Sequence, residues 1–271
     1  MGPIGVFDSG YGGLSVLKEF AALLPNYDYL YLGDNARAPY GTRSFDCVYE
    51  FTLQAVKHLF AEGCPLVIIA CNTASAKALR SIQQRDLPGL DPTRRVLGVI
   101  RPTAEAVGQL SHNGKIGIFG TPGTVASGSY DIEIKKLYPD FEVYSQGCPL
   151  WVPIVENMEI GTPGAKYFVK KYTDALFGKC ADIDTVILGC THYPLLYDDI
   201  REAVPETAQV VSQGAIVANS LADYLRRHPE MEQRLSKGGS ITYTTTEHPD
   251  KFSDLAEIFM SRPVTATRVE L

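Results

Sequence analysis

Cys71 is a candidate catalytic residue, because it is a thiol at the end of a predicted strand. It follows an apolar run, residues 66–70, that predicts a buried strand, and it precedes Asn72 and Thr73, either of which could cap a helix. A thiol at a helix N-terminus is favoured as the thiolate, the reactive form. An isolated cysteine of this kind is more often a small buried hydrophobic residue. A functional interpretation of Cys71 therefore needs a partner.

Cys190 provides a candidate partner. It ends a second apolar run, which begins with residues 186–188, and His192 lies two residues beyond it. Two such thiols admit three chemistries: a nucleophile with an auxiliary group, a redox pair, or an acid and a base acting on opposite faces of one substrate carbon. A redox pair usually has the spacing C-x-x-C, which this chain lacks. A nucleophile formed by Cys190 and His192 stays open, as does an acid–base pair of thiols.

Two polar loops also follow predicted strands. Asp8 and Ser9 lead into a glycine-rich turn, residues 10–13, that matches neither the dinucleotide fingerprint nor the P-loop. Asp8 would repel an anion, so we expect Ser9 and free backbone N–H groups to hold a carboxylate, with Asp8 meeting an ammonium group or orienting a thiol. A simple Asx-type turn is an equal alternative. Residues 33–41 form a loop rich in turn formers that could cover a ligand with backbone amides.

Two further residues join the candidates through their positions. Thr121 stands in the second half of the chain where Ser9 stands in the first. Glu156 follows a strongly apolar run and could support His192 if it lies beside a cleft, although most such glutamates are surface residues. The remaining histidines have no partner pattern, and we expect them at the surface: His58, His112, His228 and His248.

Strand and helix patterns alternate along the chain, which predicts the α/β class. Short apolar runs predict strands at 4–7, 29–32, 66–70, 96–100, 116–119, 186–188 and 210–211, and apolar residues at three- and four-residue spacing predict helices at 14–24, 45–62, 75–84, 125–138, 164–177 and 216–226. This order favours parallel strands, right-handed crossovers and helices on both sheet faces, the doubly wound architecture. Loops at the carboxyl ends of the strands are then the expected active site.

A weak internal sequence similarity suggests two lobes. Residues 5–10 resemble residues 117–122, and residues 67–73 resemble residues 186–192, although chance similarity between apolar strands is an alternative. We expect one lobe from residues 1–95 plus 207–271, carrying Cys71, and the other from residues 96–206, carrying Cys190. Residues 87–92 would form a hinge, and strands at 241–245 and 265–269 would return to the first lobe.

The composition excludes several classes of protein. The chain has 271 residues, is 45% hydrophobic and carries a net charge of −6, which disfavours both disorder and the basic patch of a nucleic-acid binder. It has neither a long apolar stretch nor a recognisable leader, so we expect a cytoplasmic protein with no membrane contact. Its six cysteines are too sparse for a disulfide scaffold and lack metal-site spacing, so we expect reduced thiols and no metal.

Four motifs together resemble the bacterial glutamate racemases of the aspartate/glutamate racemase superfamily. They are residues 8–10, 39–41, 70–76 and 188–195, and residues 243–246 with Pro249 resemble that family's closing segment. The resemblance implies two pseudo-symmetric, doubly wound lobes with mostly parallel sheets and the active site in the cleft between them. It also implies interconversion of L- and D-glutamate without a cofactor, a supply of D-glutamate for peptidoglycan synthesis, and a homodimer.

The resemblance also implies residue roles. Cys71 and Cys190 would exchange protons with opposite faces of the substrate, with Asp8 assisting Cys71, and His192 and Glu156 assisting Cys190. Each thiol must serve as acid and as base, which requires pKa values near neutrality. The matching substrate-binding positions are Asp8, Ser9, Pro39, Tyr40, Gly41, Asn72, Thr73, Thr121, Thr191 and His192.

Three other functions stay open from the sequence. A racemase of the same superfamily could act on aspartate or a hydantoin, a binding module could use the cleft without catalysis, and a Cys-His hydrolase would need only Cys190. Two departures from the family pattern, Ala38 before Pro39 and Trp151 before Glu156, leave every motif intact.

Overall fold

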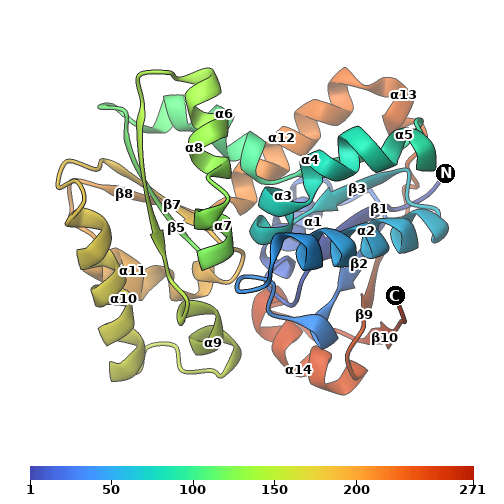
Figure 1. The fold of residues 1–271 in the computed structure, drawn as a ribbon. Coiled ribbons are helices and arrows are strands. Elements are labelled where there is room, and N and C mark those ends of the chain that lie inside the picture. Colours follow the sequence, from blue (N-terminus) through green and yellow to red (C-terminus); the bar gives the residue numbers. More distant parts are fainter.

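Ten strands form two separate sheets in the computed structural model, which describes residues 1–271. The first sheet has the order β10-β9-β2-β1-β3-β4 and the second β6-β5-β7-β8, and all neighbouring strands are parallel. Their bounds are β1 Ile4–Asp8, β2 Tyr29–Gly33, β3 Leu66–Ile69, β4 Arg95–Gly98, β5 Lys115–Gly120, β6 Glu142–Gly147, β7 Thr185–Gly189, β8 Gln209–Val211, β9 Ile241–Thr245 and β10 Ala266–Arg268. The predicted α/β class is confirmed, and Figure 1 shows the two sheets in two lobes.

Helices connect the strands. The longer ones are α1 Leu14–Leu23, α2 Phe45–Ala61, α6 Ile100–Leu110, α8 Ser129–Leu137, α10 Pro163–Phe177, α12 Gly214–Arg227 and α14 Pro249–Met260; the shorter ones are α3 Asn72–Lys77, α4 Leu79–Ser81, α5 Leu87–Leu90, α7 Pro122–Ala126, α9 Trp151–Glu156, α11 Tyr197–Ala203 and α13 Pro229–Glu232. Ser44 and Thr162 cap α2 and α10 by accepting a backbone N–H, as hydroxyl caps do. The predicted helices at 14–24, 45–62, 164–177 and 216–226 are confirmed within two residues at each end.

The two sheets share one topology. The strand order β2-β1-β3-β4 in the first matches β6-β5-β7-β8 in the second when four is added to each number. The segments that echo each other in the sequence therefore occupy matching strands, β1 with β5 and β3 with β7. Cys71 comes shortly after β3, and Cys190 comes directly after β7. Because all strands are parallel, the loops that follow them open at one edge of each sheet.

Side chains of the first sheet alternate between two apolar clusters. In β3, Leu66 and Ile68 pack on the α1 side, whereas Val67 and Ile69 pack on the α2 side, as expected for a strand buried on both faces. Burial of each such side chain contributes roughly 1.5–3 kcal/mol to folding.

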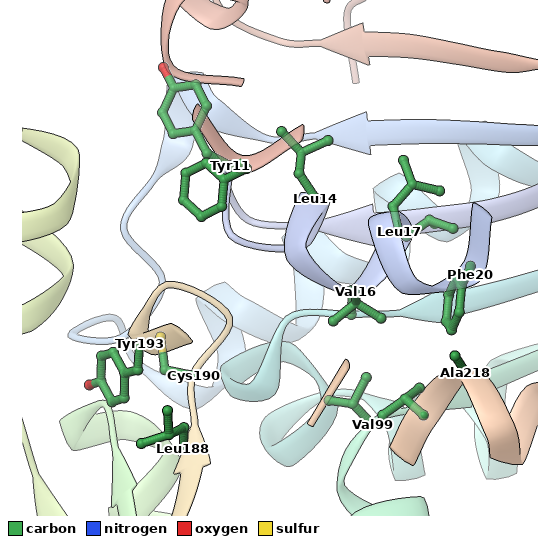
Figure 2. Packing of buried hydrophobic residues seen from close by; sticks show 14 of the residues in the cluster. Tyr11, Leu14, Val16, Leu17, Phe20, Val99, Leu188, Cys190, Tyr193 and Ala218 are labelled. Carbon is green, nitrogen blue, oxygen red and sulfur yellow. The ribbon is translucent and has the colours of Figure 1, made fainter. Parts of the chain in front are cut away.

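The larger of these clusters continues from one lobe into the other. Figure 2 shows Val16 and Phe20 of α1 directed toward Val99, at the start of α6, and Ala218 of α12. The chain passes between the lobes in α6 and in α12, and these two helices pack against each other. The lobes are therefore joined by buried apolar contacts as well as by the chain. No helix is both long and apolar enough to span a bilayer.

Some elements differ from the prediction. The strand expected at 96–100 ends at Gly98, and α6 begins at Ile100; α6 itself and β6 were not predicted. Strand β6 lies at the edge of its sheet and is only half-buried, so its sequence lacks a continuous apolar run. The helix expected at 125–138 is divided because Gly128, with φ of 63°, separates α7 from α8.

The lobe boundaries also shift. Residues 87–90 form α5, which precedes β4 of the first sheet, so the hinge expected at 87–92 lies inside the first lobe. Strand β4 belongs to the first sheet and β8 to the second, because each pairs with a buried central strand there. We therefore propose lobe boundaries after Gly98 and after Val211, in place of 95/96 and 206/207.

Candidate active site

A cavity of about 130 Å³ lies where the loops that follow β1, β3, β5 and β7 meet. Both lobes line it: Ser9, Cys71 and Thr73 come from the first, and Thr121, Cys190 and His192 from the second. This volume is below the ~300–1,000 Å³ of sites for drug-sized ligands, which fits a small substrate. A larger groove, about 640 Å³, opens between α4, α6, α8 and α12 but contains neither of these cysteines, so its size does not make it the reaction site.

Cys71 is itself the N-cap of α3. Its Sγ accepts from the backbone N–H of Ala74 at 3.4 Å and lies 3.4 Å from Ser9 Oγ. The caps expected from the sequence, Asn72 and Thr73, are instead the first two residues of the helix. Burial, reinforced by the charge of Asp8, raises the pKa of Cys71 to about 12. The backbone N–H of Ala74 at the helix N-terminus lowers this pKa, as expected, but desolvation outweighs it, so the pKa near neutrality expected from the sequence is not found for Cys71.

Cys190 belongs to a chain of three polar side chains. Its Sγ lies 4.0 Å from Nδ1 of His192, whose Nε2 lies 3.0 Å from Oε1 of Glu156. Burial alone would lower the pKa of His192, but Cys190 and Glu156 together outweigh it and raise the pKa to about 10. His192 is therefore protonated at neutral pH. Figure 2 shows Cys190 at the end of its strand, next to Tyr193.

Asp8 lies behind the cavity lining and links the two lobes. Its Oδ1 accepts from the backbone N–H of Gly13 at 2.9 Å and from the hydroxyl of Thr191, in the other lobe, at 3.4 Å. Its Oδ2 is buried without a partner. Burial raises the pKa of Asp8 to about 6, against the lowering effect of protonated His192.

Threonine hydroxyl groups from both lobes lie within hydrogen-bonding distance of one another beside the cavity. Thr73 Oγ1 lies 2.9 Å from Thr121 Oγ1 and 3.3 Å from Thr124 Oγ1. The carbonyl of Gly41 accepts from the N–H of Gly123 at 2.8 Å, which brings the loop of residues 33–41 onto the second lobe. These contacts form a polar wall beside the two thiols.

Comparison with known proteins identifies the family of this chain. The family model for Asp/Glu/hydantoin racemases matches residues 4–221. The chain belongs to this family. It is 40% identical to a glutamate racemase from Ruegeria sp. (strain TM1040), over 97% of this chain and 98% of that one.

Solved structures of the family have the same fold. A glutamate racemase isoform from Bacillus anthracis superimposes with a TM-score of 0.90 at 34% identity, over 100% of this chain and 98% of the other. A glutamate racemase from Francisella tularensis, solved with D-glutamate, gives 0.86 at 32% identity, over 100% and 97% of the two chains. The two-lobed, doubly wound architecture expected from the sequence is that of this racemase family.

The fold brings most of the sequence-predicted site residues to one place. Those lining the cavity are Ser9, Pro39, Tyr40, Gly41, Cys71, Asn72, Thr73, Thr121, Glu156, Cys190, Thr191 and His192. Asp8 does not line it. The hydroxyl of Tyr40 donates to Asp34, so its proton is not available to a ligand. None of His58, His112, His228 and His248 lies on the lining.

Sequence reasoning missed three residues at or behind the cavity. Cys148 is a third, fully buried thiol on its wall, and no local pattern separates this cysteine from a core residue. Asp34 is buried and accepts from Arg37, Tyr40 and Thr246. Gln213 hydrogen-bonds to Asn72 at 2.8 Å. A polar residue directly after a strand was the only signal for Asp34, and it was interpreted as part of a loop.

Proposed function

We propose that this protein interconverts L- and D-glutamate by a two-base reaction at the α-carbon, with Cys71 and Cys190 as the two bases and without a cofactor. Family membership makes the chain an amino-acid racemase, an isomerase. The observation that supports the two-base reaction is the placement of one thiol from each lobe on a single small cavity. Inversion at carbon needs a base on one face and an acid on the other, and opposite lobes supply opposite faces.

In each turnover one cysteine gains a proton and the other loses one. The Cys71 thiolate removes the α-proton of D-glutamate and becomes a thiol, while the electrons of the C–H bond stay on the α-carbon. The Cys190 thiol then donates its proton to the opposite face and becomes a thiolate. The roles reverse for L-glutamate, so each turnover exchanges the protonation states of the two cysteines.

The neighbouring groups suit these roles. Burial and the charge of Asp8 keep Cys71 in its thiol form at neutral pH, so each Cys71 thiolate that forms is a strong base. Protonated His192 can return a proton to Cys190 across their 4.0 Å contact. The hydroxyls of Ser9, Thr73, Thr121 and Thr191, with nearby backbone N–H groups, are suited to holding the substrate's carboxylates. In so enclosed a cavity such contacts stabilise developing charge strongly.

The first test follows the circular dichroism of L-glutamate, and separately of D-glutamate, with purified protein, a reducing agent and no added cofactor. We expect the signal to decay to zero from both enantiomers. Decay of the signal with aspartate but not with glutamate would show that aspartate is the substrate. No decay with either glutamate enantiomer, in the presence of folded protein, would refute the proposal.

Cysteine variants test the two-base step. We expect Cys71→Ser and Cys190→Ser each to lose about 10²–10⁴-fold in racemisation, because a positioned acid or base contributes that much. Cys47→Ser is the matched control, since Cys47 is a partly exposed thiol on α2 that does not line the cavity. Normal turnover in either site variant would refute the two-base model. Normal turnover in Cys71→Ser beside loss in Cys190→Ser would favour chemistry carried by Cys190 and His192 alone.

We further propose that the product D-glutamate supplies peptidoglycan synthesis and that the protein works as a homodimer. The support for both is the similarity to the glutamate racemases. Rescue of a bacterium that requires D-glutamate by the wild-type chain, but not by Cys71→Ser, tests the first. Sedimentation velocity tests the second, and a single monomeric species at working concentration would contradict it.

A further inference from the structure

A closed ring of polar side chains lies beside the cavity, at the junction of the two lobes. It contains Asn72 of α3, Tyr130 of α8 and Gln213, the N-cap residue of α12, and Thr103 of α6 binds it from outside. All four are buried, with exposed fractions of 0–4%. Buried polar groups are costly unless their bonds are satisfied, so such a ring has one preferred arrangement.

The hydrogen bonds of the ring run in one direction. Asn72 Nδ2 donates to Gln213 Oε1 at 2.8 Å, Gln213 Nε2 donates to the Tyr130 hydroxyl at 2.5 Å, and that hydroxyl donates to Asn72 Oδ1 at 2.6 Å. Each member of the ring is therefore both a donor and an acceptor. Reversal would require the two amides to exchange their oxygen and nitrogen positions together.

Thr103 fixes the direction of the ring. Its hydroxyl donates to the carbonyl of Val99 at 2.9 Å, so its oxygen is left to accept from Gln213 Nε2 at 2.8 Å. A hydroxyl has one proton, and this one is already used. The Gln213 amide nitrogen must therefore face Thr103 and Tyr130, and its oxygen must face Asn72.

The fixed direction has a consequence for the cavity. Asn72 follows Cys71 directly and lines the cavity, its amide oxygen is occupied by Tyr130, and its nitrogen uses one N–H on Gln213. Its second N–H has no protein partner. A free N–H attracts an anion, whereas a free amide oxygen would repel one.

We propose that Gln213 is a positioning residue, which, with its direction set by Thr103, holds the Asn72 amide so that it presents an N–H donor to a carboxylate of the substrate. This inference rests on the proposed function. Gln213 and Thr103 lie on the two helices in which the chain crosses between the lobes. The orientation of the Asn72 amide, next to Cys71, therefore depends through these hydrogen bonds on how the two lobes are arranged.

A double-mutant cycle tests the inference. We expect Gln213→Ala to raise KM for glutamate about 10-fold with a smaller change in kcat, because a binding contact is lost rather than a proton-transferring group. In an Asn72→Ala background the same change should alter KM less than about 2-fold, because the group that Gln213 positions is gone. Gln209→Ala, four residues away on β8 and outside the ring, is the matched control and should leave KM unchanged.

A second pair of variants keeps the test independent of folding. Thr103→Val retains the volume but removes the hydroxyl that fixes the direction, so KM should rise, whereas Thr103→Ser should restore it at a similar melting temperature. Full additivity in the cycle, or equal KM values for Thr103→Val and Thr103→Ser, would overturn the inference. Failure of the wild-type protein to racemise glutamate would instead overturn the proposed function on which it rests.

Discussion

Asp8 is an ionisable side chain of this site whose charged form is disfavoured by burial. Its carboxylate is fully buried, one oxygen has no partner, and its pKa is raised to about 6. A raised folded-state pKa means that the folded protein binds more protons than the unfolded chain between about pH 4 and pH 6. The contribution of Asp8 to stability is therefore present below pH 4 and is lost as the pH rises through 6.

Asp8→Asn should make the protein more stable and less active. Removing the buried charge should raise the free energy of unfolding at pH 8 by about 2–3 kcal/mol relative to the wild type, with the difference vanishing near pH 4. Racemisation should fall only partially, because Asp8 tunes proton transfer at Cys71 without transferring the proton itself. Urea unfolding at the two pH values and the racemisation rate measure both effects. A variant less stable than the wild type at pH 8 would contradict this account.

Glu156→Gln should move the pH profile. Glu156 raises the pKa of His192, so with the neutral amide that pKa should fall from about 10 toward its ordinary value. The alkaline limb of kcat/KM should then shift to lower pH, because His192 loses its proton earlier. Glu159→Gln, three residues away and off the cavity, should leave the profile unchanged. An unshifted alkaline limb in Glu156→Gln would refute the role of this pair.

At the scale of elements, the loop of residues 33–41 depends on one buried carboxylate. Asp34 accepts from Arg37 Nε at 2.7 Å, from Thr246 Oγ1 at 2.9 Å and from the hydroxyl of Tyr40. Thr246 directly follows β9, so the end of the chain helps to hold a loop that lines the cavity. The C-terminal strands therefore contribute to the site without touching it.

Asp34→Asn should loosen this loop. An amide has one acceptor oxygen in place of two, so at least one bond is lost and Arg37 is left without its charge partner. We expect about 2 kcal/mol of destabilisation and a roughly 10-fold rise in KM. Asp223→Asn is the matched control, because Asp223 also pairs with arginine, through Arg226 and Arg227, but is solvent-accessible, so its loss should change stability far less. Hydrogen exchange across residues 33–43 locates the effect, and unchanged protection there would contradict it.

At the scale of the whole molecule, the site exists only while the lobes stay in contact. A Cβ on Gly12 would lie 2.2 Å from Thr191 Oγ1 and 2.5 Å from His192 Nδ1, so this glycine allows the first lobe to approach the second. The continuous apolar cluster beneath α1 holds the lobes at that separation. We therefore expect activity to depend on the packing between the lobes.

Gly12→Ala should separate the two halves of the site. We expect kcat/KM to fall at least about 100-fold, because a misplacement of this kind is costly to proton transfer. The free energy of unfolding should fall by only about 1–3 kcal/mol. Gly89→Ala is the control, since a Cβ there meets no atom within 4 Å. Wild-type activity in Gly12→Ala, measured by circular dichroism, would show that the lobes need not approach so closely.

Much of the site could be predicted from the sequence because its signals are local. An apolar run followed by a polar residue indicates a strand end, and parallel strands place their ends at one edge, so Cys71, Cys190, Ser9 and Thr121 were found together. Half-buried edge strands carry a weaker pattern, which is why β6 was missed. Sheet membership of β4 and β8 depends on pairing between distant segments, which local patterns do not carry, so the boundaries that we propose from the sheets lie a few residues later than those expected from the sequence.

The fold class, the two candidate cysteines and the family resemblance could be predicted from the sequence, because periodicity and motif residues depend on near neighbours. The electrostatics of the site depend on the packed structure. Whether Cys71 favours its thiol or thiolate depends on how deeply it is buried and on Asp8, which is 63 residues away. The direction of the Asn72 amide likewise depends on Gln213 and Thr103. Burial and hydrogen-bond partners belong to the packed molecule, so no local pattern carries them.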